Sequence, residues 1–469
     1  MTTQEQTSDK PQIEEISLYE KRENIYQKEV SGRFQNGRAV TLLLLAGVFL
    51  AGPWWRYGDR QAIWLDLPAR RFHFFGITFW PQDFILLSWL LITAAFGLFF
   101  FTNLAGRLWC GYGCPQTVWT KFFMWIEWLT EGDRNQRILL DRAPWSVRKV
   151  GRKAAKHASW VALSLAVGVT FVGYFSPIRE LLVSAARFDL GGTQAVAVGL
   201  LSAALYLDAG WMREQICKYA CPYARFQGAM FDSSTLTIFY DRTRGEPRGH
   251  RRPSAAATKN GLGDCVDCGA CVHVCPTGID IRKGTQYECI GCAACIDACD
   301  EIMDKMGYAR GLVRYATEKS LAGKPVRIFR PRLVAYGAVF LTMLSGLTYA
   351  LANRVPLELD ILRERNRLYR ETSDGAIENL YRLRILNMDQ KLHRYAIAAS
   401  GIEALVYEGD PEVDVAPGEI RDVPVRLQAP ARVLRDESTE IRFEIRTTDG
   451  SDLSVQEESR FLAPVRGER

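Results

Sequence analysis

Residues 265–299 contain the stretch that decides the fold: Cys265-Val-Asp-Cys268-Gly-Ala-Cys271-Val-His-Val-Cys275-Pro276, followed by Cys289-Ile-Gly-Cys292-Ala-Ala-Cys295-Ile-Asp-Ala-Cys299. Each half has the spacing CxxCxxCxxxC, and two such halves are the arrangement that holds two [4Fe–4S] clusters. Three thiolates within seven residues can reach three corners of a cubane only if the loop is tight. We expect the fourth cysteine of each half to start a helix and turn toward the other cluster.

This crossing predicts the two ligand sets. Cys265, Cys268, Cys271 and Cys299 would bind one cluster, and Cys289, Cys292, Cys295 and Cys275 the second. Zinc is the alternative, but zinc sites usually present two ligand pairs separated by a longer spacer. Eight cysteines satisfy two clusters, so His273, which lies inside the first half, is not expected to be a ligand. The second half departs from a symmetric ferredoxin, because Asp300 follows Cys299 where Pro276 follows Cys275.

The remaining four of the 12 cysteines form two copies of a second motif, CxYxCP. One copy spans Cys110–Pro115 and the other Cys217–Pro222, and each follows a long apolar segment. Proline is favoured in the first turn of a helix, so a helix should begin after each second cysteine, where a thiol has a lowered pKa. Cys110, Cys114, Cys217 and Cys221 are therefore candidate ligands of a soft metal: Cu(I), zinc or iron–sulfur. The alternative is four buried structural thiols. Asp208 is a further functional candidate, because it lies in the end of an apolar span.

Five segments are apolar and nearly long enough to cross a bilayer as helices: Ala39–Trp55, Phe84–Thr102, Ala158–Phe175, Thr193–Trp211 and Leu333–Leu351. Trp54, Trp55 and Trp211 stand at the ends of these segments, where interfacial anchors are expected. None of the five histidines lies in a predicted span, so a bis-histidine haem wire has no ligands.

The loop charges predict the orientation. Lys and Arg are abundant before the first span, between the second and third, and in residues 212–332, but sparse in residues 176–192. The positive-inside rule therefore places the N-terminus and all the cysteines on the cytoplasmic side, and the residues after 352 outside.

The length of 469 residues suggests about three domains, and the composition, with 48% hydrophobic and 24% charged residues, averages apolar spans with large polar regions. No cleavable signal is visible in the polar first 38 residues, and no cysteine follows residue 299, so a secreted disulfide scaffold is excluded. The net charge of +6 is too mild to suggest nucleic acid. The basic, Pro- and Gly-containing stretch 241–260 is expected to be an extended linker lying against anionic lipid headgroups.

From residue 376 the pattern changes to short alternating runs separated by turns, which indicates a β-sandwich of about seven strands. The preceding Asn353–Arg370 is expected to be helical or irregular. His393 is isolated in the sequence and is predicted to lie on the surface or on a strand face. We expect a binding or docking domain without a catalytic site.

These features divide the chain into the segments 1–38 (cytoplasmic), 39–240 (four spans and both CxYxCP motifs), 241–260 (linker), 261–330 (two-cluster ferredoxin domain), 331–352 (fifth span) and 353–469 (periplasmic domain).

Six stretches together resemble the FixG/RdxA/CcoG family of cytochrome c oxidase accessory proteins: LYEKRENIYQKEVSGRF, WCGYGCPQTVW, CKYACPYARFQ, YDRTRGEPRG, GDCVDCGACVHVCPTGIDIRKG and ECIGCAACIDACD. The resemblance implies five spans, two clusters, an immunoglobulin-like outer domain and a place in the bacterial inner membrane. It also implies a role in assembling C-type haem–copper oxidases, by reduction of Cu(II) to Cu(I). The four CxYxCP cysteines would then be the catalytic copper site, and the partners would be membrane lipid, a cytoplasmic electron donor and copper-handling oxidase assembly proteins.

Two other functions remain open at this point. One is a quinol dehydrogenase or electron relay of a respiratory chain, because membrane polyferredoxins carry similar Cys-Pro motifs. The other is a non-enzymatic assembly scaffold whose clusters sense redox state.

Overall fold

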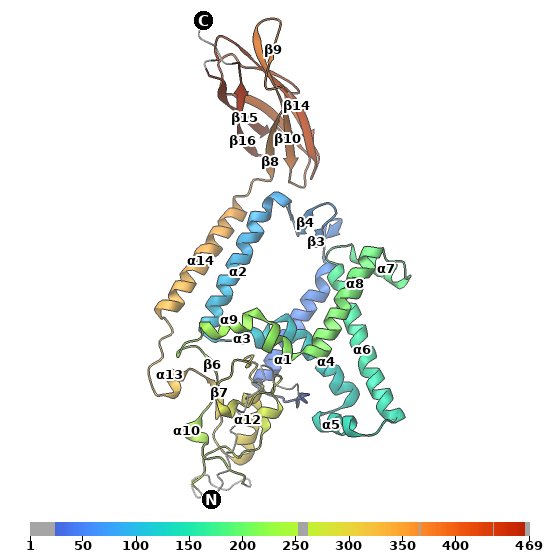
Figure 1. Cartoon of the computed structure of the whole chain (residues 1–469), viewed down its shortest axis with the longest axis vertical. Helices are drawn as coiled ribbons and strands as arrows, with labels where there is room; N and C mark the ends of the chain where they lie inside the picture. Colours follow the sequence, from blue (N-terminus) through green and yellow to red (C-terminus); the bar gives the residue numbers. More distant parts are fainter. Residues whose placement is uncertain (1–23, 252–260, 365–366, 435, 465–469) are drawn as a thin grey trace, which may run out of the picture. The chain divides into compact units, whose positions relative to one another are not determined.

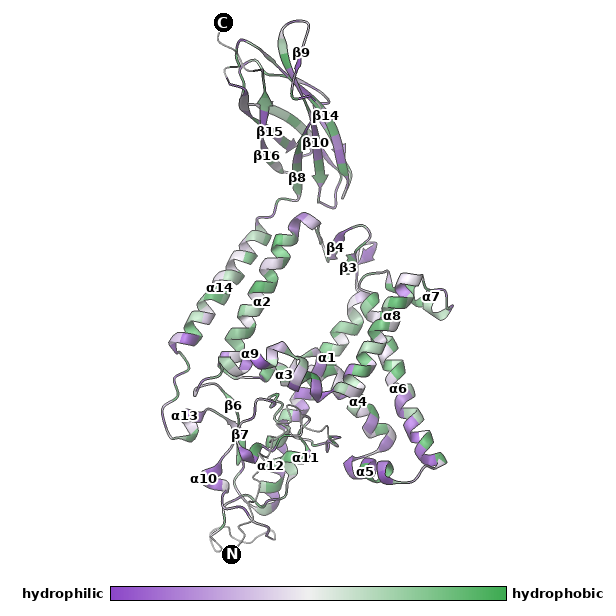
Figure 2. Ribbon diagram, viewed as in Figure 1, coloured by the Kyte–Doolittle hydropathy of each residue, from purple (hydrophilic) through white to green (hydrophobic). Residues whose placement is uncertain are grey.

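The computed structural model describes residues 24–251, 261–364, 367–434 and 436–464 (Figure 1). Five of the described helices are long and apolar enough to cross a membrane, in agreement with the five predicted spans: Arg33–Trp54, Pro81–Ala105, Val147–Val172, Gly192–Met212 and Pro331–Ala352. Figure 2 shows the apolar character of α2 (Phe84–Ala105) and α14 (Pro331–Ala352) along most of their length. The chain is a membrane protein.

The third span begins 11 residues earlier than predicted, at Val147 instead of Ala158. Its first turns are rich in Lys and Arg, so a prediction based on hydropathy did not include them in the span. Lys149 lies in the first turn of this helix, and its Nζ donates to the carbonyls of Asp141 (3.0 Å) and Ala143 (2.7 Å). The earlier start places His157 inside a span, so the prediction that no histidine lies in one is wrong.

The chain divides into two compact units, and each is described by itself. The first comprises residues 1–43, 105–162 and 206–326; the second comprises residues 44–104, 163–205 and 327–469.

In the second unit, α2 and α14 pack against each other. The rings of Phe100 and Phe340 stack with their centroids 6.2 Å apart. At the end of this pair, Arg354 forms a two-point ion pair with Asp83, with Nε–Oδ1 and Nη2–Oδ2 distances of 2.8 and 2.6 Å. The other elements of this unit are η1 (Gly52–Trp54), β1 (Arg56–Tyr57), β2 (Arg60–Gln61), β3 (Ile63–Asp66), β4 (Arg71–Phe74), β5 (Ile77–Phe79), η2 (Pro81–Asp83), α7 (Ile178–Ala186) and α8 (Gly192–Leu205).

The C-terminal part of the second unit is a β-sandwich. One sheet has the order β12-β14-β10-β8, with β9 beside β10, and the other has the order β13-β11-β15-β16. The strands are β8 (Leu357–Arg363), β9 (Arg370–Glu371), β10 (Ala376–Asn387), β11 (His393–Ser400), β12 (Val406–Glu408), β13 (Glu412–Val415), β14 (Ile420–Pro430), β15 (Ser438–Thr447) and β16 (Ser454–Leu462). The predicted sandwich is confirmed, but its described strands number nine instead of seven.

The prediction for Asn353–Arg370 is wrong in part, because this segment contains β8. Alternate side chains of β8, Leu357 and Leu359, enter the sandwich core, although the charged residues between and after them conceal the pattern. Pairing with β10 satisfies the backbone of β8, with Leu359 opposite Ile385.

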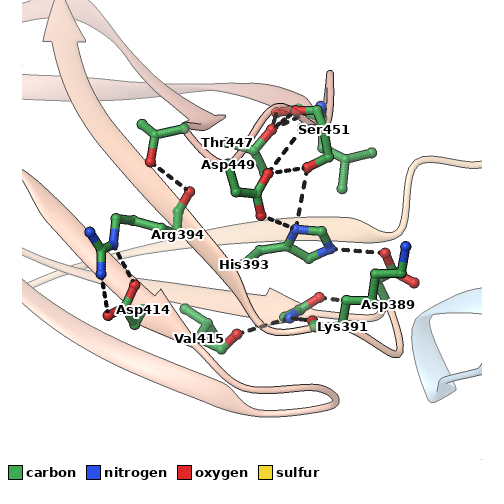
Figure 3. A network of polar contacts seen from close by, with 12 residues as sticks. Asp389, Lys391, His393, Arg394, Asp414, Val415, Thr447, Asp449 and Ser451 are labelled. Carbon is green, nitrogen blue, oxygen red and sulfur yellow. Dashed lines mark hydrogen bonds and ion pairs between the residues drawn. The ribbon is translucent and has the colours of Figure 1, made fainter.

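His393 begins β11, so its predicted place on a strand is confirmed, but it is buried, with 3% of its surface exposed, and the alternative of a surface position is wrong. Its Nδ1 lies 2.6 Å from Asp449 Oδ2, and its Nε2 lies 2.9 Å from Asp389 Oδ2 (Figure 3). Burial alone would lower the pKa of His393, but the hydrogen bonds and charges of the two aspartates raise it. The hydroxyl and backbone N–H of Ser451, together with His393, hold the pKa of Asp449 well below its usual range. This network joins the turn after β10 to the turn after β15.

The network predicts how the stability of the sandwich depends on pH. A raised histidine pKa stabilises the folded state fully below about pH 6.5, and this contribution is lost as the pH rises through the folded-state pKa. The lowered pKa values of Asp389 and Asp449 have the opposite effect: the stabilisation that they provide is present above about pH 4 and is lost as the pH falls below it. In the full-length protein, the midpoint of thermal proteolysis of the sandwich should therefore be highest between these limits. His393→Gln should lower it by several degrees and flatten the alkaline decline. An unchanged alkaline slope in the variant would contradict the assignment.

The first unit contains α1 (Arg33–Ala51, which continues into the second unit) and several short elements around the cysteines: α3 (Leu108–Tyr112), α4 (Pro115–Glu131), α5 (Arg134–Arg142), the start of α6 (Val147–Val172), the π-helices η3 (Tyr206–Met212) and η4 (Ile216–Ala220), α9 (Pro222–Met230), β6 (Thr237–Tyr240), α10 (Arg242–Gly245), α11 (Ala270–His273), η6 (Ile281–Lys283), α12 (Ala294–Met306), β7 (Val313–Ala316) and α13 (Glu318–Leu321). Strand β6 pairs with β7 and so joins the chain before the ferredoxin run to the chain after it.

The described part of the basic stretch 241–260 is not an extended linker. Asp241 caps α10 by accepting from the backbone N–H of Arg244. Arg244 forms an ion pair with Asp264, and Arg251 donates to the carbonyl of Gly263 (2.6 Å) and the hydroxyl of Tyr308 (2.9 Å). Residues 241–251 therefore pack on the ferredoxin region instead of forming the predicted extended linker; residues 252–260 lie outside the described part of the chain.

Candidate redox site

The two predicted ligand sets line two separate small cavities. Cys265, Cys268, Cys271 and Cys299 line one of them, together with apolar side chains such as Met303 and Leu312. Cys275, Cys289, Cys292 and Cys295 line the other, which Cys271 also borders, together with Ile238, Ile279 and Ile281. In each set, therefore, three sulfurs come from one half of the run and one from the other half.

The two cysteine loops have the same backbone conformation. Asp267 and Gly291 precede the second cysteine of each half, and Gly269 and Ala293 follow it; all four have left-handed φ, between 53° and 68°. This conformation is unfavourable for a side-chain-bearing residue such as Ala293, by about 1–2 kcal/mol. It turns the chain sharply enough for consecutive thiols to point into one cavity, which meets the need for a tight loop.

The fourth cysteines differ from the expectation that each starts a helix. Cys275 follows the short helix α11, and Cys299 lies within α12, one turn after Cys295. Each reaches the opposite cavity because α11 and α12 begin immediately after the left-handed residues Gly269 and Ala293.

The donor chemistry of both cavities fits a metal–sulfur cluster. Their eight thiols are soft sulfur donors; burial raises the pKa of Cys271, Cys289 and Cys299 to about 12, so binding of a metal, which needs the thiolate form, would displace protons from these thiols. Among the residues that the structure describes, no three His, Cys, Asp or Glu side chains converge closely enough to hold a single metal ion. Thiols spaced more widely than this suit the separate iron atoms of a cubane better than one zinc ion.

The helices predicted after the CxYxCP motifs are present. Cys114 is the N-cap of α4 and Cys221 is the N-cap of α9, with Pro115 and Pro222 in the first turns. The first cysteines of the motifs, Cys110 and Cys217, lie in α3 and η4.

The fold brings the two motifs together. The thiol of Cys110 donates to Gln227 Oε1 in α9 at 3.5 Å, and Arg107 donates to the carbonyl of Ala224 in the same helix. Each of Cys110 and Cys217 interacts electrostatically with Cys221 and Cys114. The four thiols thus form one group, although no three of them are arranged around a single point.

At the start of α4, the expected lowering of the thiol pKa is wrong. Burial raises the pKa of Cys114, and the backbone N–H groups of Gln116 and Thr117 offset it only in part. Burial also raises the pKa of Cys110 to about 11 and that of Cys217 to about 12. Nearby, one carboxylate oxygen of Asp208 is buried without a hydrogen-bond partner among the described residues, and its charge acts on Cys114.

The cluster formed by the four CxYxCP cysteines packs directly against the loop of the second cluster cavity. A Cβ atom on Gly111 would stand 2.9 Å from the carbonyl oxygen of Ile290 and 3.0 Å from Cys292 Cα. A Cβ atom on Gly291 would likewise stand 3.1 Å from the carbonyl of Arg107. Two glycines therefore allow the backbone between Arg107 and Gly111 to touch the backbone between Ile290 and Cys292.

Two polar side chains of α1 hold these backbones together. Gln35 Nε2 donates to the carbonyl of Cys292 (2.9 Å), and Arg38 Nε donates to the carbonyl of Gly111 (2.8 Å). Arg38 also donates to Gln35 Oε1 (3.3 Å). The start of α1 is fixed in turn by Asp297 of α12, which accepts from the backbone N–H of Gln35 at 2.7 Å. Gln35, Arg38 and Asp297 could not be identified from the sequence, because each acts on a residue far away in the chain.

Iron–sulfur ligand sets in a chain with five membrane-length helices define a membrane-bound polyferredoxin, an electron-transfer protein. Family models agree: a 4Fe-4S binding domain matches residues 86–153, a 4Fe-4S dicluster domain matches 212–318, and an IG-like fold at the C-terminal of FixG matches 347–464.

Relatives extend this agreement to most of the chain. The nitrogen fixation protein FixG of Rhizobium meliloti is 42% identical over 82% of this chain and 81% of its own length. Protein RdxA of Cereibacter sphaeroides is 41% identical over 88% of both chains. A crystal structure of a FixG-related protein from Vibrio parahaemolyticus is 27% identical, with a TM-score of 0.22, over 24% of this chain and 98% of its own. The chain belongs to the FixG/RdxA family.

Proposed function

We propose that this protein reduces Cu(II) to Cu(I) at the thiols of Cys110, Cys114, Cys217 and Cys221, as an accessory factor for the assembly of C-type haem–copper oxidases in the inner membrane. The eight cysteines of the ferredoxin run would hold two [4Fe–4S] clusters, which supply one-electron transfer. Cu(I) is softer than Cu(II) and prefers thiolate ligands, so the four thiols favour the reduced ion. They need to move toward one another to bind it.

One observation carries the proposal: the backbone contact between Gly111 and the loop that contains Cys292. Electron transfer needs close approach, and this contact joins a thiol motif to a cysteine of the second cluster cavity. Cys110 and Cys217 also pack against the same small apolar cluster as Cys292. A scaffold that never transferred electrons would have no need for this contact.

Widening the contact tests the function. Gly111→Ala places a methyl group against backbone atoms of Ile290 and Cys292, which cannot rotate away. We expect Cu(II) to re-oxidise the dithionite-reduced clusters several-fold more slowly in this variant than in the unmodified protein, as followed by visible absorbance. Gly113→Ala is the matched control, because the atoms nearest to its methyl group would belong to the Trp109 side chain and not to the backbone of the cluster loop. Equal rates in the unmodified protein and both variants would contradict the proposed route, and failure of Cu(II) to re-oxidise the unmodified protein would contradict the function.

The proposed orientation places the cysteines on the cytoplasmic side and the sandwich in the periplasm, and it rests on the loop charges. A reporter that is active only outside should therefore work when fused after Asn353 and fail when fused near Gly132 or Gly261. A reporter active only in the cytoplasm should give the reverse pattern at the same sites. Periplasmic activity at Gly132 or Gly261 would reverse the orientation.

A further inference from the structure

A cavity of about 580 Å³ lies within the first unit, at the polar end of α6. Its volume is in the range typical of small-molecule sites. Trp160 and His157 of α6 line it, together with Gly210 and Trp211 at the end of the span that contains η3. The basic turns of α6 give way to apolar residues at this level, so the cavity lies where a bilayer interface meets the protein.

The charges that line the cavity balance. Four are positive (Arg137, Lys153, Lys156 and Arg213) and four are negative (Glu127, Glu131, Asp141 and Glu214). Glu127 pairs with Arg137 and Arg213, Glu131 with Lys153 and Lys156, and Asp141 with Lys153. With its cations neutralised, the cavity offers no excess positive charge to a nucleotide or another polyanion. A neutral ligand fits better.

Two lining groups have no ion pair among the described residues. Glu214 is buried and accepts a hydrogen bond from Gln215 Nε2 at 3.1 Å. His157 shares a hydrogen bond of 2.8 Å between its Nδ1 and the hydroxyl of Tyr206, which leaves Nε2 without a hydrogen bond in the described part of the chain. A buried carboxylate without a counter-charge is costly and is a candidate for proton transfer.

The cavity leads toward the thiols. A second, smaller cavity shares Ile25, Arg213 and Glu214 with it and is lined by Cys217, Pro276 and Ile290. Cys217 belongs to the proposed copper site, and Pro276 and Ile290 adjoin cysteines of the second cluster cavity. A reductant bound in the large cavity would therefore be separated from Cys217 by this smaller cavity.

We propose that the large cavity binds the headgroup of a membrane quinol, which supplies the electrons for the proposed copper reduction; the inference thus names the electron donor of that function. A quinol combines a neutral ring and two hydroxyl groups with an apolar tail, which matches a charge-balanced cavity at a membrane interface. Its oxidation breaks two O–H bonds and gives a quinone, two protons and two electrons. The protons go to Glu214 and His157 Nε2, and one electron goes to each of the two cysteine-held clusters.

The test is anaerobic reduction of the oxidised full-length protein by menadiol, followed by visible absorbance and electron paramagnetic resonance. The clusters of the unmodified protein should become reduced. Glu214→Gln and His157→Phe should each slow this reduction by about tenfold or more, the loss expected for a proton-transfer group. Both variants should keep their iron and be reduced by dithionite at the unmodified rate. Val161→Ala, an exposed position on α6, is the matched control and should react like the unmodified protein.

Reduction of both variants by menadiol at the unmodified rate would overturn the site, as would failure of menadiol to reduce the unmodified protein. The polyanion tripolyphosphate should not slow the reduction of the clusters by menadiol. If it did, the proposed neutral-ligand site would be wrong. Copper separates this inference from the function on which it rests. If dithionite-reduced protein passes electrons to Cu(II) but menadiol does not reduce the clusters, the quinol site fails and copper reduction survives. If menadiol reduces the clusters but the reduced protein does not pass electrons to Cu(II), the proposed copper reduction is wrong and the protein is a quinol-oxidising relay.

Discussion

Replacing Cys275 by alanine is expected to halve the iron content of the protein, from about eight to about four atoms per chain, with an equal loss of acid-labile sulfide. Cys275 lines the same cavity as Cys289, Cys292 and Cys295, although it belongs to the other half of the run. Loss of one thiolate leaves an iron atom of that cubane without its protein ligand. The cluster in the cavity of Cys265, Cys268 and Cys299 should survive.

Double variants show which cluster is lost. Cys275→Ala combined with Cys289→Ala should lose no more iron than either single variant, because both thiols are expected to bind one cluster. Cys275→Ala combined with Cys265→Ala should lose all of it. If the first pair removed all the iron and the second pair only half, each half of the run would hold its own cluster and the crossed ligation would be wrong. Zinc in place of iron in the unmodified protein would contradict both ligand sets.

Replacing Cys110 and Cys114 together by serine should abolish most Cu(II) reduction, and so should replacing Cys217 and Cys221. Changing residues that only support metal ligands costs about 10- to 100-fold in affinity or activity, so loss of two ligands should cost at least as much. Replacing either pair alone should be enough to cause the loss, because contacts of Gln227 and Arg107 join the two motifs into one cluster of four thiols. Copper bound after anaerobic gel filtration and the initial rate of Cu(I) formation are the measurements.

The iron–sulfur spectrum is the internal control for these variants, because the eight cysteines of the ferredoxin run are unchanged. Tyr112→Phe is the matched control: Tyr112 lies between Cys110 and Cys114, and the variant keeps all four thiols. Unmodified Cu(II) reduction in both pairs would mean that the thiols are structural. Loss of iron from either pair would instead indicate that these cysteines hold a further iron–sulfur cluster, a result in keeping with the match of a 4Fe-4S model to residues 86–153, which contain only Cys110 and Cys114.

The elements predicted correctly from the sequence depend on neighbours in the chain. The spans are contiguous apolar runs, and the turns that were expected between the strands of the sandwich, for example at residues 416–418 and 449–450, follow local preferences. Prediction failed where long-range contacts outweigh local composition. The basic start of α6 is helical because Lys149 reaches the carbonyls that end α5, and the charged β8 is a strand because it pairs with β10.

In the candidate site, too, some features depend on neighbours in the chain and others on long-range contacts. The sequence by itself determined the ferredoxin run, since three thiols that must meet one cubane lie within one short loop and their spacing is a local property. Only the tertiary structure decided that Gly111 touches the loop of Cys292 and that Gln35 and Arg38 hold the contact. In the sandwich, likewise, only the tertiary structure decided that His393 lies between two aspartates. Each of these contacts joins residues from different elements, many of them far apart in the chain. Their energy depends on distance and burial after folding, and neither quantity is encoded in the spacing of a motif.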